Sequence, residues 1–192
     1  MKARQLDIMQ TLVKMLEVKG PVKVTTASLA LECGITEAAI YRHFPSKKKI
    51  YEGLVDFCEQ NIMELIANSG SDKKTPLDNT KKILVILVSF AEKNPGLARL
   101  LTREAFSIDE STLDDRIKQM FSKIELQLKQ NIQRHEQSTK SKLILPSASA
   151  ANLLLAYSEG LIQQFVRSGF QDKPSQRLND QINFLLESLQ KI

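Results

Sequence analysis

The stretch that decides the fold is residues 25–49, TTASLALECGITEAAIYRHFPSKKK. A short helix is predicted to follow Thr25, because a hydroxyl there can accept hydrogen bonds from the unpaired N–H groups of a first helical turn. That helix should end at Gly34, since glycine readily takes the left-handed conformation of a helix terminus. A second helix opens at Thr36 and must stop before Pro45, which has no N–H group. Two short helices joined through a glycine indicate a helix-turn-helix, whose second helix has the size to enter a DNA major groove.

Apolar and polar positions separate an inner from an outer side of this unit. An αα-hairpin of another kind can imitate the pattern, so the chemistry of the outer side matters. The predicted shared core is Leu29, Ala30, Ile35, Ile40 and Phe44, and the predicted outward face is Thr36, Glu37, Ala38, Tyr41 and Arg42.

The outward face has few side chains that read bases well. Arg42 is suited to bidentate contact with a base, and Ala38 can contact a thymine methyl group. The hydroxyl and basic side chains suit phosphates, which position a protein without reading sequence. We therefore expect specificity to rest partly on DNA shape and on half-site spacing in a dimer. The predicted DNA-binding residues are Thr25, Thr26, Thr36, Ala38, Tyr41, Arg42, His43, Lys47 and Lys48.

The net charge of +5 is confined to the start of the chain. Residues 1–49 hold nine Lys and Arg against four Asp and Glu, and the other 143 residues hold 18 of each sign. Residues 47–49 are all lysines at a predicted helix start, where the helix dipole disfavours cations and a bound phosphate would compensate. A polyanion-binding head fits these charges, and a solvated basic face is the alternative interpretation.

Helical spacing of apolar residues continues along the whole chain and predicts an all-α protein of about nine helices. A first helix precedes Gly20, and a fourth begins after Ser46 with an apolar stripe of Ile50, Leu54, Phe57, Cys58, Ile62, Leu65 and Ile66. Residues 68–76 are expected to form a loop and residues 135–142 a polar connection. Further helices are expected at 77–93, 96–104, from Leu113 to Ile132, 146–168 and 175–189. This pattern divides the chain into a DNA-binding domain, 1–49, and a helical body, 50–192.

The segment from Ala148 to Val166 is apolar around much of its circumference. A helix of this kind needs cover on more than one side. A second copy of the chain would supply that cover and make a homodimer. Simple burial within one chain is the alternative.

Several classes of protein have little support in the composition. Cys33 and Cys58 match no metal or disulfide spacing, which favours a reducing cytoplasm, and the apolar run from Ile83 to Val88 is too short to span a membrane. Two histidines and no glycine-rich phosphate loop give little material for an enzyme, so no catalytic residue, metal or cofactor is expected. A ligand-responsive repressor stays open as an alternative, with Tyr157, Ser158, Glu159 and Gln163 as the candidate polar residues of a pocket in the body.

The head resembles that of the TetR family of transcription regulators. The likeness rests on the helix-turn-helix and on the Tyr-x-His-Phe-x-x-Lys run at residues 41–47 that closes it. Blocks of the body at 92–97, 116–128 and 159–168 resemble a branch of that family, the nucleoid-occlusion factors. The resemblance implies a TetR-like fold, with a three-helix head and a dimerising helical body, and a homodimer on double-stranded chromosomal DNA in the cytoplasm.

The same resemblance implies a protein partner, the tubulin-like division GTPase FtsZ, whose assembly the dimer would antagonise. The C-terminal tail of FtsZ is expected in a groove between the fourth and fifth helices. Lys93 stands where relatives tend to have arginine, which replaces a planar fork by a point charge. The positions that match residues of this groove are Phe57, Ile86, Lys93 and Asn94. Neither a membrane nor a small-molecule ligand is expected as a partner.

Overall fold

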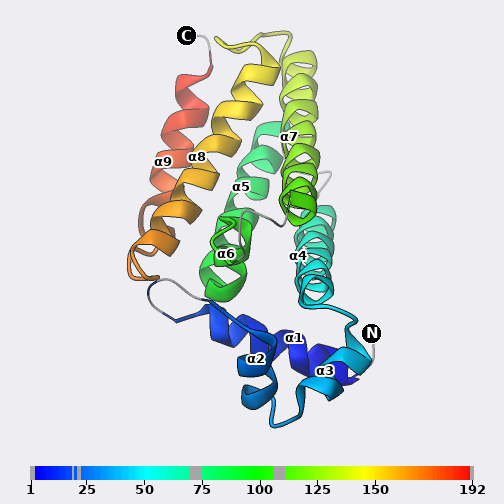
Figure 1. The fold of residues 1–192 in the computed structure, drawn as a ribbon. Helices are drawn as coiled ribbons and strands as arrows, with labels where there is room; N and C mark the ends of the chain where they lie inside the picture. Colours follow the sequence, from blue (N-terminus) through cyan, green and yellow to red (C-terminus); the bar gives the residue numbers. More distant parts are fainter. Residues whose placement is uncertain (1–2, 19, 21–22, 70–74, 106–110, 191–192) are drawn as a thin grey trace.

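The computed structural model describes residues 3–18, 20, 23–69, 75–105 and 111–190. All regular structure within these residues is α-helical, in agreement with the sequence prediction (Figure 1). None of the described helices combines the length and the apolar character of a membrane span. The helices are α1 (Ala3–Leu16), α2 (Thr26–Glu32), α3 (Glu37–His43), α4 (Lys47–Ser69), α5 (Pro76–Lys93), α6 (Pro95–Leu101), α7 (Ser111–Thr139), α8 (Ser147–Arg167) and α9 (Ser175–Ser188).

The head consists of α1, α2 and α3, at one end of an elongated molecule (Figure 1). Thr25 precedes α2 and forms a capping box with Ser28, in which each side chain accepts a hydrogen bond from the other's backbone N–H group. Gly34 has φ +65° in the turn, and Thr36 caps α3 by accepting from the N–H group of Ala39. The helix-turn-helix therefore forms at the residues predicted from the sequence. Its predicted core is confirmed, with Leu29, Ala30, Ile40 and Phe44 buried and Ile35 packed against them.

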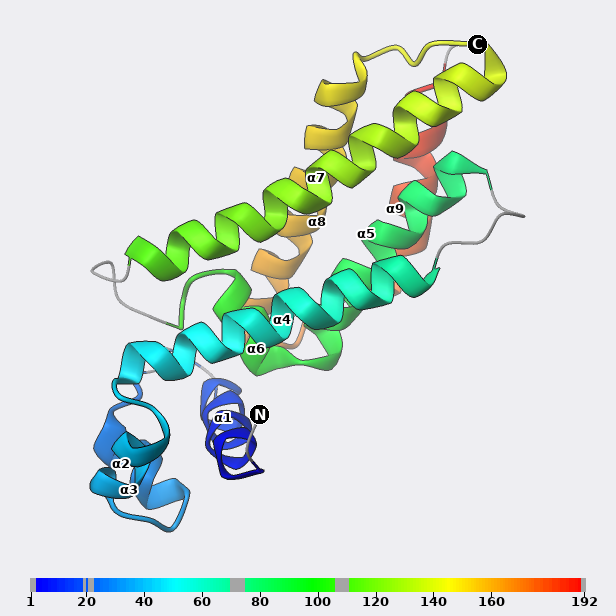
Figure 2. The ribbon, with the colours of Figure 1, turned by 90° about the vertical axis from the view of Figure 1, so that its right-hand side faces the viewer.

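The body is a helical bundle built around α5, which packs against α4, α6, α7, α8 and α9. Helix α4 starts beside the head and continues into the body alongside α5 and α7, so it belongs to both (Figure 2). Ion pairs of Asp56 with Arg116 and of Glu59 with Lys123 join α4 to α7. The head is thereby attached to the body along a continuous helix as well as through α1.

Helix α6 approaches the backbone of α1 directly. Gly96 lies against the carbonyl group of Val13, so closely that a Cβ atom at residue 96 would overlap it. Close backbone approach is a standard reason for a glycine within a helix. The junction between head and body is consequently a packed interface rather than a tether.

Two of the expected helix ends were wrong. Helix α7 continues through His135 to Thr139, because hydroxyl and amide side chains tolerate an exposed helix end, and Ser138 and Thr139 donate to the His135 carbonyl group. Helix α6 ends at Leu101 instead of about residue 104, since Arg103 adopts a left-handed φ of +66°.

Leu65 was expected in the apolar stripe of α4 but is 47% exposed. It precedes the buried Ile66 by one residue, and one step turns a helix by about 100°. Of the predicted loop at 68–76, residues 68 and 69 belong to α4, Pro76 opens α5, and residues 70–74 lie outside the described residues.

Replacing Gly96 by alanine should destabilise the protein by at least about 2 kcal/mol, because α1 and α6 must separate to admit the new methyl group. Thermal unfolding measures this. Gly53→Ala is the matched control, since the nearest atom to its added Cβ would be the thioether sulfur of Met9, at 3.2 Å, and a methionine side chain can move. Equal melting temperatures for the two variants would contradict the close approach of α1 and α6.

Candidate nucleic-acid interface

The exposed face of α3 is the centre of the candidate interface. Ala38, Tyr41 and Arg42 are exposed, whereas Ile40 on the opposite side is fully buried. His43, at the end of the helix, is half-buried, and its carbonyl oxygen accepts a hydrogen bond of 3.1 Å from the side-chain amide of Gln5 in α1. Helix α1 thus holds the end of α3, while the residues predicted to read bases stay accessible.

The threonines of the predicted interface already have partners in the chain. The Thr25 hydroxyl accepts from the Ser28 N–H group at 3.0 Å, and the Thr36 hydroxyl accepts from the Ala39 N–H group at 3.2 Å. The Thr36 hydroxyl only accepts, so it keeps a hydrogen that can be donated to a phosphate. The Thr25 hydroxyl also donates to the Ser28 hydroxyl at 3.1 Å, so it must turn away from Ser28 to donate to DNA. Both side chains are exposed, and we expect both to approach phosphates.

Thr26 differs from the other two threonines because it is buried. Its hydroxyl oxygen lies 3.4 Å from that of Tyr41, which donates to it. Tyr41 itself is 47% exposed. We therefore expect Thr26 to orient Tyr41 toward DNA and not to contact DNA itself.

The three lysines at the start of α4 are partly compensated within the chain. Lys48 donates to the Thr112 hydroxyl at 2.9 Å, and Lys49 pairs with Glu52 at 2.5 Å. The ammonium group of Lys47 lies 5.4 Å from the ring centre of Tyr51, a cation-π contact. The Lys49–Glu52 pair makes the electrostatic need for an external anion smaller than the sequence suggested, and the Lys48 ammonium group keeps two donors for a phosphate.

The residues expected to bind a protein partner do not all meet. Phe57 and Asn94 line one hollow of about 580 Å³, together with Leu54, Leu97 and residues of α1. Ile86 is half-buried against the core, and Lys93 is exposed on the last turn of α5; neither lines that hollow. We call this hollow the junction groove; its walls are α1, α4 and the α5–α6 turn, and it is lined by Leu6, Met9, Gln10, Val13, Lys14, Glu17, Leu54, Phe57, Asn94 and Leu97.

Sequence reasoning missed the contribution of α1 to the junction groove. Leu6 and Val13 have the apolar spacing of a core-facing side, yet Leu6 is exposed and Val13 half-buried. Spacing along one helix shows which residues share a face but not which other helix covers it. A signal was present in the excess of apolar positions, which makes that face wider than a three-helix head needs.

The polar residues proposed for a ligand pocket in the body mostly serve other contacts. Tyr157 donates to Gln181 of α9 at 2.7 Å, and the buried Ser158 donates to the Leu154 carbonyl group. Glu159 and Gln163 line a hollow of about 210 Å³ beside α6 and α7, and burial raises the pKa of Glu159. That volume lies below the roughly 300–1,000 Å³ typical of ligand pockets.

Both halves of the chain match known protein families. Residues 8–54 match the family of bacterial regulatory proteins called tetR, and residues 74–190 match an SlmA-like family described as the C-terminal domain of tetracyclin repressor-like proteins. The nucleoid occlusion factor SlmA of Shewanella pealeana is 42% identical over 97% of this chain and 94% of its own length. SlmA of Shewanella oneidensis is 41% identical over the same shares.

Solved structures with little sequence identity have the same fold. The fatty acid degradation regulator FadR of Bacillus halodurans has a TM-score of 0.84 at 13% identity, covering 98% of this chain and 97% of that one. FadR of Bacillus subtilis, solved with stearoyl-CoA, has a TM-score of 0.80 at 16% identity, covering 95% and 98%. These similarities concern the fold alone.

Replacing Arg42 by alanine should cost about 1–3 kcal/mol at the base it reads and relax the preference at that position. Replacing Lys47 by alanine should weaken binding to all duplexes alike and lower the salt dependence by about one released ion. Selection from a random duplex pool, followed by titration at several salt concentrations, measures both effects. A base preference that survives unchanged in Arg42→Ala would rule out its role as a reader.

Proposed function

The chain belongs to the TetR family and, within it, to the nucleoid occlusion factors of the SlmA type, and on that footing we propose how it acts. As a DNA-bound homodimer in the cytoplasm, it antagonises FtsZ polymerisation and so blocks septum formation over the nucleoid. The observation that carries this proposal is the identity of about 41% with SlmA over nearly the whole chain, body included. The role is one of binding, without catalysis.

The division of labour follows the predicted domains. Residues 1–49 would bind double-stranded DNA, with α3 in the major groove, and residues 50–192 would form the dimer and receive FtsZ. The excess positive charge lies entirely in the first part, which supports this assignment. DNA contacts are assigned to eight of the nine residues predicted from the sequence, and Thr26 acts through Tyr41.

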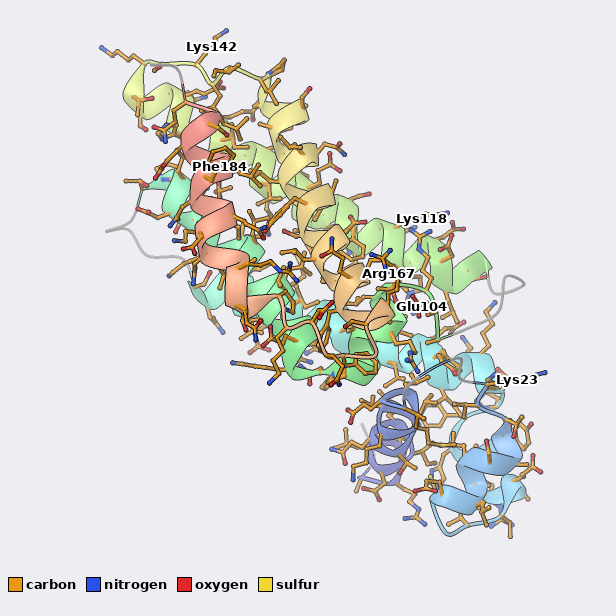
Figure 3. The ribbon with its side chains drawn as sticks, turned by 90° about the vertical axis from the view of Figure 1, so that its left-hand side faces the viewer. Lys23, Glu104, Lys118, Lys142, Arg167 and Phe184 are labelled. Atoms are coloured by element: carbon orange, nitrogen blue, oxygen red, sulfur yellow. The ribbon has the colours of Figure 1, made fainter. Side chains whose placement is uncertain are left out.

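The outer face of α8 and α9 is the surface that a second copy would cover. Phe184 of α9, labelled in Figure 3, is 69% exposed. Leu153 of α8 is 41% exposed. Gly160 lies in the second half of α8, with nothing within 4 Å of where a Cβ atom would be. A glycine inside a helix costs about 1 kcal/mol relative to alanine, and contacts within the chain do not explain it. Close approach of a partner helix does explain it, and apolar side chains beside it would lose their exposure to water.

The junction groove is the proposed site for the FtsZ tail. Its lining is largely apolar, with Phe57 on one wall and Leu97 beside it, as a peptide anchor requires. Asn94 is fixed by donating to the Phe90 carbonyl group at 2.8 Å, which leaves its amide oxygen for a peptide N–H group. Lys93, which precedes Asn94 in the chain, is exposed and would attract an acidic tail.

Replacing Phe184 by glutamate should weaken the dimer by at least about 2 kcal/mol, because a carboxylate would be buried in each half of a symmetric interface. Sedimentation equilibrium measures the dissociation constant. Leu126→Glu is the matched control, since Leu126 is also exposed but lies on α7. A Phe184→Glu protein that stays as dimeric as the control would refute the α8–α9 interface.

Replacing Phe57 by alanine should reduce the effect on FtsZ about tenfold, since it removes the apolar anchor of the groove. The assay is sedimentation of FtsZ polymers with GTP, with and without the tightest duplex selected from a random pool. Leu65→Ala, an exposed position on the same helix, is the control variant, and FtsZ lacking its C-terminal tail is the control substrate. Unchanged polymer under every condition would discard the division role and leave a repressor.

A further inference from the structure

Arg99 is a charged residue buried at the junction of head and body. Its side chain is on α6, and the residue is 2% exposed. One guanidinium nitrogen, Nη1, donates to the carbonyl oxygen of Val18 at 2.7 Å, just beyond the end of α1. Burial lowers the pKa of this guanidinium, and the negative charge of Glu104 opposes that shift. Arg99 therefore holds the carbonyl end of the first helix of the head.

The other side of the guanidinium rests on an aromatic ring from a distant part of the chain. Its carbon atom lies 5.0 Å from the ring centre of Phe170, in the turn between α8 and α9. Phe170 has a left-handed φ of +66°, and its ring meets that of the buried Phe165 edge to face at 5.3 Å. The contact thus continues into the core of α8, the helix of the proposed dimer interface.

Stability alone does not explain an arginine in this place. A buried charge costs several kcal/mol, and an apolar residue of similar volume is often as stable or more so. The Nε group of Arg99 has no hydrogen-bond partner, and the carboxylate of Glu104 accepts a hydrogen bond from Gln163. What a planar guanidinium offers here is a directed donor on one side and a face that stacks on the other.

We propose that Arg99 is a positioning residue that fixes the direction of α1, and with it the DNA-binding head, relative to the α8–α9 turn. This inference rests on the proposed dimer, because in a dimer the two head directions set the distance between the two α3 helices. That distance selects the spacing of half-sites on DNA. Arg99 contacts no base or phosphate in this proposal; it sets specificity from the far side of the head.

The test uses Arg99→Met, which removes the donor and the charge but keeps an unbranched side chain. The probes are the tightest duplex selected by the unchanged protein and two versions with one base pair added or removed between the half-sites. We expect Arg99→Met to remain dimeric, to bind the selected duplex about tenfold more weakly, and to lose most of its discrimination among spacings. The control is Arg134→Met, an exposed arginine near the far end of α7.

A second readout reports the head position without DNA. Spin labels on Glu32→Cys, an exposed residue of α2, in a Cys33→Ser background give the distance between the two heads of a dimer. Arg99→Met should broaden this distance distribution, and Arg134→Met should leave it unchanged. An equally narrow distribution and full spacing discrimination in Arg99→Met would overturn the proposal.

The experiment distinguishes a failure of the proposed function from a failure of the proposal for Arg99. If the unchanged protein is monomeric or ignores every duplex, the proposed function fails, whatever Arg99 does. If Arg99→Met does not fold, Phe170→Leu replaces it, since this variant retains the bond from Arg99 to Val18 and loses the aromatic ring with its contacts to Arg99 and Phe165. Phe170→Leu should show a partial loss of spacing discrimination, and unchanged discrimination in that variant would overturn the proposal.

Discussion

The contact of α1 with α6 is the constraint on which the rest of the structure depends. Gly96 of α6 lets the backbone of Val13 in α1 come close, and Arg99 of α6 donates to the Val18 carbonyl group just after α1. The head therefore cannot turn without disturbing α6. The junction groove exists because α1 is held there, with Met9 and Val13 facing Phe57 and Leu97. In the proposed function, DNA recognition and partner binding share one structural element, and a change in the direction of α1 would affect both.

Some of the positive charge in the head already has partners within the chain. The excess of positive charge attracts a polyanion from a distance, but Lys48 and Lys49 already have partners at the start of α4. Few side chains on α3 can read bases, and only Arg42 among them has a bidentate fork. We therefore expect specificity to come largely from the geometry of the two heads on DNA. A rigid head–body junction is needed to keep that geometry.

Local signals allowed the fold of the head to be predicted, and long-range packing limited the rest. Thr25, Gly34, Thr36 and Pro45 act through their own backbone neighbours, and the structure places α2 and α3 where these residues predict them. The burial of Thr26 under Tyr41 depends on contact between two helices, which spacing within either helix does not reveal. The role of Arg99 was also not predictable, because its partners lie 81 and 71 positions away in the chain.

The most direct measurement of the central claim is the composition of the complex that forms from the protein, its selected duplex and a peptide of the FtsZ tail. Native mass spectrometry gives the number of each component in one particle. The account predicts an even number of protomers on each duplex, with one tail peptide bound per protomer. Single protomers on DNA, or particles in which duplex and peptide never occur together, would contradict it.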